Sequence, residues 1–141
     1  MKRTLLFLFT VTVMASVAGV MDSVAQSRRN RAAREFMQQK LEHAQKILEG
    51  LTLEDHVLIR EHARKLAAMS RAAEWPLFEN PEYTQFNAAF RREVESLILA
   101  ARDKNLDGAA LAYLQVTMSC VQCHKFVRGR LVASHRGSAM N

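Results

Sequence analysis

Apolar side chains recur every three or four residues along most of the chain, which is the spacing of α-helices that each bury one face. No segment shows the two-residue alternation of a half-buried strand. Together with the turn-forming residues between the periodic segments, this pattern predicts four helices after an apolar N-terminal run. We expect them to span approximately residues 30–49, 53–73, 81–101 and 108–128.

Residues that commonly begin or end helices mark the expected boundaries. The first helix is expected to stop at Gly50, and Thr52 is expected to cap the second. Asn80 is the expected cap of the third helix, with Pro81 at its first position, where proline's missing N–H costs nothing. Asp107 is expected to cap the fourth.

The connections within the first and the last pair of helices are short, so each pair should form an antiparallel hairpin. The fold class predicted is therefore all-α, an antiparallel up-down-up-down four-helix bundle. The side chains expected to face inward are, helix by helix, Met37, Leu41, Ala44, Leu48 and Leu51; Ile59, Ala63, Leu66 and Met69; Tyr83, Phe86, Phe90, Val94, Leu97 and Ala101; and Ala110, Leu114, Thr117, Val121 and His124.

The N-terminus has the order of a secretory signal peptide: basic Lys2 and Arg3, an apolar run over residues 5–20, and small residues ending at Ala25. This order predicts a signal peptide over 1–25 and a periplasmic mature domain over 26–141, with a flexible tail over 129–141. An uncleaved anchor is the alternative, but the run is shorter than the roughly 20 residues that span a bilayer. After cleavage no stable membrane span is expected.

The chain of 141 residues has a net charge of +6 and only two cysteines, which excludes a disulfide framework. Nucleic acid is not an expected partner, because no groove pattern of mixed basic and aromatic residues is present. The basic clusters are read either as solvated chain ends or as a surface for an acidic partner protein. Their members are Arg28, Arg29, Arg31 and Arg34, and Lys125, Arg128, Arg130 and Arg136.

The two cysteines belong to the pentapeptide Cys120-Val121-Gln122-Cys123-His124. In Cys-x-x-Cys-His, each thiol adds across a haem vinyl group and the histidine gives iron an axial nitrogen. On a helix these three side chains share one face and can meet one porphyrin edge. The alternatives are a local disulfide, a redox dithiol, which normally accompanies a βαβ pattern, and a zinc site, which lacks its other ligands.

Helix rise along the antiparallel first and fourth helices brings Met37 nearly level with His124, so Met37 is a candidate sixth ligand of iron. Met69 on the second helix is its rival, and both methionines could instead fill core space. His43, His56 and His62 lie farther from the haem end and are expected to be surface or packing residues. The aromatic side chains expected to wall the porphyrin are Phe36, Trp75, Phe86 and Phe90.

The sequence resembles the class II c-type cytochromes, the cytochrome c′ group, over most of the chain after residue 25. The matching stretches are Ile47-Leu48-Glu49-Gly50, residues 63–75, Leu106-Asp107 and residues 119–128. The resemblance implies one covalent haem c, His124 as the proximal ligand and Arg128 near the proximal face. It also implies a distal position on the first helix, at about Met37, where members have either a ligating methionine or an apolar residue that blocks the iron.

These observations predict a periplasmic mono-haem cytochrome that performs one-electron transfer with redox partner proteins. The alternative is a five-coordinate haem protein that binds small gases such as NO or CO, and a haem-free interaction module would require the pentapeptide to be accidental. A homodimer is a further candidate assembly. No enzyme activity is expected, because no acid/base pair or nucleophile constellation accompanies the motif.

Overall fold

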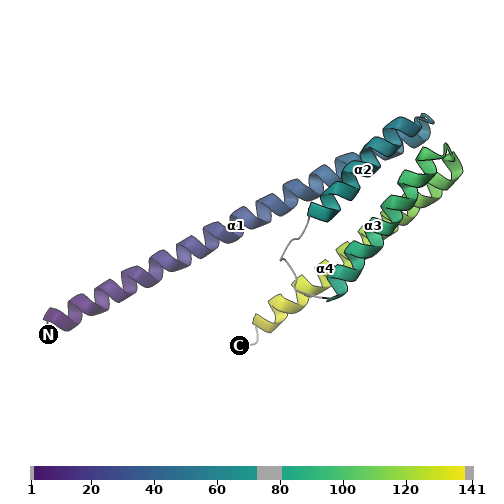
Figure 1. The fold of residues 1–141 in the computed structure, drawn as a ribbon. Helices are drawn as coiled ribbons and strands as arrows, with labels where there is room; N and C mark the ends of the chain where they lie inside the picture. The colour runs from purple at the N-terminus through teal and green to yellow at the C-terminus, as the bar shows by residue number, and fades with distance from the viewer. Residues whose placement is uncertain (1, 73–80, 139–141) are drawn as a thin grey trace. The chain divides into compact units, whose positions relative to one another are not determined.

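The computed structural model describes the backbone of residues 2–72 and 81–138, and the side chains of residues 21, 23–71 and 81–130. Its helices are α1 (Lys2–Thr52), α2 (His56–Ala72), α3 (Pro81–Arg102) and α4 (Leu106–Ser138), shown in Figure 1. Over the described ranges the chain contains no strand. The chain divides into two compact units, residues 1–39 and 40–141.

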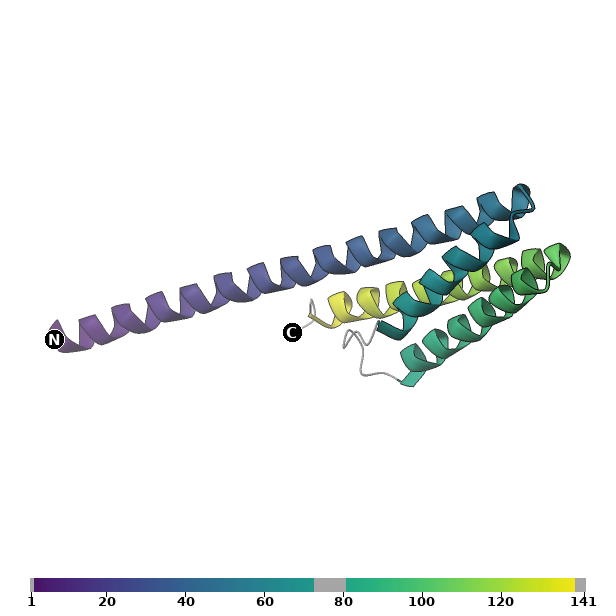
Figure 2. The same ribbon diagram turned by 45° about the horizontal axis from the view of Figure 1, so that its top comes forward.

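The all-α four-helix bundle predicted from the sequence is confirmed. In the second unit, residues 40–52 of α1 pack with α2, α3 and α4 around one apolar core. Figure 2 shows α3 and α4 side by side and running in opposite directions, as expected of a hairpin. The first unit is the N-terminal part of α1, which forms a helix without a break through the predicted signal peptide and on to residue 39.

The cap of α2 is Asp55, and the prediction of Thr52 was wrong. One carboxylate oxygen of Asp55 accepts hydrogen bonds from the backbone N–H groups of Val57 at 3.0 Å and Leu58 at 2.9 Å. Thr52 is instead the last residue of α1, where its hydroxyl donates to the Glu49 carbonyl. A carboxylate satisfies two of the free N–H groups at the helix start, which explains the later boundary.

The cap of α4 also differs from the predicted residue, and it lies two residues before it. The side-chain oxygen of Asn105 accepts a hydrogen bond from the Gly108 N–H at 2.9 Å, and α4 begins at Leu106. Asp107, the predicted cap, lies inside the first turn, where a carboxylate still opposes the positive end of the helix dipole. The predicted cap of α3, Asn80, lies outside the described residues.

Both hairpin loops have the same construction. Glu54 and Lys104, which precede the two caps, each adopt a left-handed backbone with φ of 55°. The next N–H, that of Asp55 or Asn105, donates to a carbonyl five residues earlier at 2.8 Å and 2.9 Å respectively. This pattern ends one helix and caps the next within three residues, although neither left-handed position has the usual glycine.

Gly50 does not end α1 as predicted but lies inside its last turn. A Cβ atom placed on Gly50 would lie 2.9 Å from Cγ1 of Ile59 and 3.1 Å from its backbone N. The glycine therefore permits close packing of α1 against the start of α2, which explains its presence without a helix end.

The core consists of side chains from all four helices of the second unit: Ile47, Ile59, Ala63, Leu66, Ala67, Phe90, Val94, Leu97, Ile98, Ala101, Ala109, Ala112 and Val116. On α2 and α3 the central residues of the predicted inner faces are buried, which confirms those two faces. At their ends Met69, Tyr83 and Phe86 are half-buried.

The predicted inner face of α4 was wrong, and that of α1 was wrong in part, since Ala44 and Leu51 are half-buried and Leu51 packs against the core. On α1 the buried side chain is Ile47, whereas Leu41 and Leu48 are 51% and 49% exposed. On α4 the chain buries the face of Ala109, Ala112 and Val116 and exposes the predicted side chains Ala110, Leu114, Thr117, Val121 and His124. Both helices have apolar residues on more than one face, so their spacing alone did not identify the side that packs.

The fourth helix continues well beyond its predicted end near Arg128 and reaches Ser138. Among the described residues, no helix is both long enough and apolar enough to cross a membrane.

Candidate functional site

The pentapeptide lies in the middle of α4, so its side chains have helical spacing as predicted. Cys120 and Cys123 are both free thiols rather than a local disulfide. Cys120 and His124 are exposed and Cys123 is half-buried. Two thiols and an imidazole are therefore available on adjoining turns of one helix.

Lys40, on α1, is the charged residue that accompanies these thiols. Its ammonium lies 4.6 Å from the centre of the Phe90 ring, which is a cation–π distance, and its side chain is half-buried. Burial lowers the pKa of Lys40, whereas the charges of Cys120 and Cys123 raise it in part. The side chains of α1, α3 and α4 thus meet beside the motif.

Burial and charge act on the pKa of the two thiols in the opposite directions to those seen for Lys40. Removal of water by neighbouring side chains raises the pKa of both Cys120 and Cys123, although the former is exposed at its surface. The charge of Lys40 opposes this effect at both sulfurs. At neutral pH the two cysteines are consequently held as thiols, the form that does not bind metal ions readily.

Aromatic side chains of α3 and α4 pack close to the motif. The ring centres of Phe86 on α3 and Phe126 on α4 are 5.2 Å apart. Phe126 comes three residues after Cys123 along α4. Burial raises the pKa of the Tyr83 phenol, and the nearby charge of Cys123 adds to the increase. Phe126 is one helical turn after Cys123, so this ring pair places apolar surface near the second cysteine.

A hydrogen bond between helices aligns the first half of α4 with α1. The Tyr113 hydroxyl donates to the Ala44 carbonyl at 3.1 Å, one turn after Lys40 on α1. Burial raises the pKa of Tyr113, and the charge of Cys120 contributes in the same direction. Tyr113 thus lies between the core and the first cysteine of the motif.

Ser70 is a buried polar residue near the end of α2, close to the part of α3 that contains Phe86. It is 1% exposed, and within the described part of the chain its hydroxyl has no hydrogen-bond partner. Its carbonyl accepts a hydrogen bond from the Asn87 side chain at 3.4 Å, next to Phe86 on α3. An unpaired buried hydroxyl costs stability unless another group reaches it.

The residues predicted from sequence lie in different parts of the chain. Met37 belongs to the first unit and is 40% exposed, and Phe36 is a half-buried residue of the same unit. Arg128 is exposed on α4, and Trp75 lies outside the described residues. The sixth-ligand assignment to Met37 or Met69 stays a prediction.

Sequence reasoning missed Lys40, because it treated lysines as solvated positions on helical faces. The available signal was its place three residues after Met37, on the same side of α1 as the predicted distal ligand.

The donor set fits a covalently attached haem. Two free thiols and an exposed imidazole on one face of α4 are the groups that attachment and axial ligation use. Phe86, Phe90 and Phe126 supply apolar surface, and the buried hydroxyl of Ser70 has no hydrogen-bond partner among the described residues. Within the described ranges no group of three or more His, Cys, Asp or Glu side chains could hold a bare metal ion.

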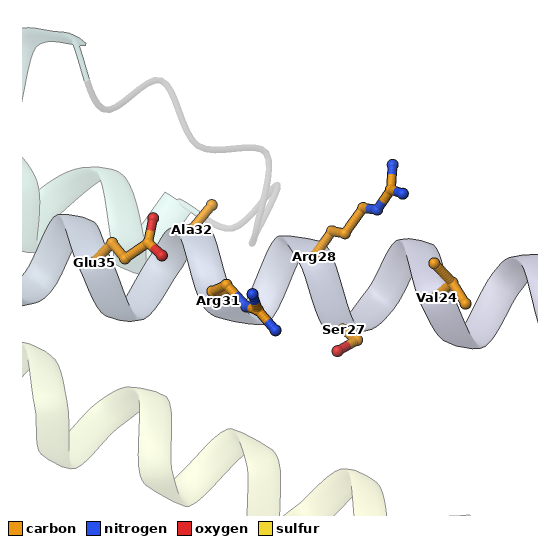
Figure 3. A pocket seen from close by; sticks show the side chains of 6 residues that line it. All are labelled: Val24, Ser27, Arg28, Arg31, Ala32 and Glu35. Atoms are coloured by element: carbon orange, nitrogen blue, oxygen red, sulfur yellow. The ribbon is translucent and has the colours of Figure 1, made fainter.

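A surface depression on α1 is separate from these residues in sequence and chemistry. Figure 3 shows its lining, all from one helix of the first unit, with three charged side chains among six. Its members are Val24, Ser27, Arg28, Arg31, Ala32 and Glu35. A depression along one exposed helix cannot enclose a cofactor in apolar side chains, so we do not include this depression in the candidate site.

In comparisons with known proteins, no family model, curated protein or solved structure matches this chain.

Proposed function

We propose that this chain is an exported c-type cytochrome with one covalently attached haem, and that it transfers single electrons. The observation on which the proposal rests is the Cys120–His124 pentapeptide on α4, with both thiols free and the imidazole exposed. The resemblance of the same residues to the class II cytochromes supports it.

The roles of the residues follow from their chemistry. Cys120 and Cys123 hold the haem through thioether bonds, and His124 is the proximal ligand. The bound haem supplies the one-electron chemistry, while the protein provides the ligands and the dielectric around it. Phe86 and Phe90 exclude water, and Lys40 adds a half-buried positive charge next to the attachment site. Arg128 is a basic group at the proximal side.

Gas binding is the second candidate function, and the exposure of Met37 favours it. A methionine that ligates iron is normally enclosed by the protein, whereas Met37 is 40% exposed in the first unit. If neither Met37 nor its rival Met69 is a ligand, the iron would be five-coordinate and open to NO or CO. A high-spin visible spectrum with rapid CO uptake, unchanged in Met37→Ala, would establish this role in place of electron transfer.

Export and partners complete the proposal. Cleavage after Ala25 releases a periplasmic protein that begins at Gln26 and remains basic. Intact-mass measurement of periplasmic protein identifies that N-terminus. Acidic redox proteins are the proposed partners, since exposed arginines lie along α1 at residues 28, 29, 31 and 34. A homodimer remains a candidate assembly.

Haem attachment is the decisive experiment. After expression with a cytochrome c maturation system, acid–acetone extraction should leave the haem on the polypeptide, and intact mass should show one haem per chain. Cys120→Ser or Cys123→Ser should leave at most one thioether, while Lys125→Ala, a neighbouring exposed change, should not reduce attachment. Fully extractable haem, or none, contradicts the proposal.

A further inference from the structure

A pair of histidines from two different helices lies at the α1–α2 hairpin. The Nδ1 atoms of His43 and His62 are 3.1 Å apart, and the ring centres are 5.1 Å apart with the ring planes tilted by 60°. Both side chains are half-buried. Both were expected to be surface or packing residues, because they lie far from the haem end, and 19 residues separate them in the sequence.

The distance between these two nitrogens fits a hydrogen bond, and it also fits two ligands of one metal ion. Imidazole nitrogens bind transition metals at about 2.0–2.1 Å, so two of them 3.1 Å apart give an angle of about 100° at a shared ion. That angle lies between the values of square-planar or octahedral and of tetrahedral ligands. A single ion could therefore bind both Nδ1 atoms with little movement of either helix.

The surroundings keep both rings neutral near pH 7, which is the form that binds metal. Burial is the largest cause that lowers the pKa of each imidazole, and Lys65 lowers both further. The ammonium of Lys65 is itself paired with Glu61 at 2.6 Å, so its repulsion of a cation is reduced. Lys46, the other nearby cation, is paired with Glu49 at the same distance.

We propose that His43 and His62 form a two-imidazole binding site for a divalent transition-metal ion, with Cu²⁺ preferred over Ni²⁺ and Zn²⁺. This site is independent of the haem proposal. In the described ranges no third His, Cys, Asp or Glu joins the pair, so water completes the coordination and the ion exchanges readily. Imidazole ligands exclude the hard ions Mg²⁺ and Ca²⁺, and the order among the others follows their general affinities.

The test is thermal unfolding of the untagged mature protein, followed by circular dichroism. Any cysteine that carries no haem is first blocked with iodoacetamide, so that Cys120 and Cys123 cannot supply a rival site. A Ni²⁺ excess should raise the Tm by about 5 °C, because an ion that binds only the folded state stabilises it. EDTA should reverse the increase, Mg²⁺ should not reproduce it, and acidification should weaken it as the rings protonate.

Matched variants separate this site from other histidines. His43→Gln and His62→Gln should each lose the Ni²⁺ effect, whereas His56→Gln, also on α2, should keep it. A His62→Gln protein that retains the full increase overturns the proposal, as does a wild type that shows none. If a variant fails to fold, diethylpyrocarbonate labelling of wild type decides: Ni²⁺ must protect both rings, and equal labelling with and without the ion contradicts the site.

Discussion

The ammonium of Lys40 lies 4.6 Å from the centre of the Phe90 ring, and its charge acts on both sulfurs of the Cys-x-x-Cys-His motif. A lysine that is half-buried in this way has less mobility and less screening by water than one on the surface. It joins α1, α3 and α4 next to the group of residues proposed to hold haem. Its effects should therefore be measurable in both the haem-bound and the haem-free protein.

In the haem-bound protein, Lys40→Met should lower the reduction potential by on the order of tens of millivolts. A nearby positive charge disfavours ferric iron, so its removal stabilises the oxidised state. Potentiometric titration gives the value. Lys46→Met is the control, since Lys46 is exposed and paired with Glu49. Equal potentials for Lys40→Met and wild type would exclude this electrostatic role.

In the haem-free protein, the thiols should react slowly with iodoacetamide at pH 7.5, because the pKa of both cysteines is raised. Lys40→Met should slow the reaction further, since the lysine charge is the largest effect that lowers those pKa values. The rate is followed by mass spectrometry across pH. Faster alkylation in the variant would mean that the lysine shields the thiols instead of acidifying them.

The side of α4 that packs can be tested with two neighbouring substitutions. Val116→Ala should cost about 2 kcal/mol of unfolding free energy, because Val116 is 1% exposed and its removal leaves a cavity. Leu114→Ala should cost less than about 0.5 kcal/mol, although leucine is larger, because Leu114 is 58% exposed. Urea unfolding measures both free energies. A larger loss for Leu114→Ala than for Val116→Ala would show that α4 packs through the face predicted from sequence.

The position of the α2 cap gives a similar comparison. Asp55→Ala should destabilise the protein by about 1 kcal/mol, since two backbone N–H groups lose their acceptor. Thr52→Ala should have a smaller effect, because its hydroxyl only donates to a carbonyl within α1. The measurement is again urea unfolding at neutral pH. Equal losses in the two variants would contradict the Asp55 cap.

The histidine pair should also make stability depend on pH. The pKa values of His43 and His62 are below their ordinary value of 6.5 in the folded protein, so the unfolded chain binds protons first. Stability should therefore be highest above pH 6.5 and fall as the pH decreases below it. The charged groups that act on the pair are Glu42, Lys46, Glu61 and Lys65.

Urea unfolding between about pH 8 and pH 5 measures this dependence. His62→Gln should flatten it, whereas His56→Gln should leave it as in wild type. A slope that is unchanged in His62→Gln would assign the effect to other groups.

Several features were determined by the sequence alone, each for a local reason. Ile59, Ala63 and Leu66 on α2, and Val94 and Leu97 on α3, lie on helices with one clear apolar face, so their spacing was sufficient to predict burial. The all-α hairpin topology followed from short links between such helices. The pentapeptide on α4 is also local, because its chemistry depends on the spacing of three side chains on one helix.

Other features were decided only by the tertiary structure. Leu114 and Val116 are both apolar, and which one is buried depends on the helices that pack against α4. Asn105 and Asp107 are both good caps, and backbone geometry in the loop selects the first. The contacts of Lys40 with Phe90 and of His43 with His62 depend on the register between helices, and the period of residues along any one helix contains no information about that register.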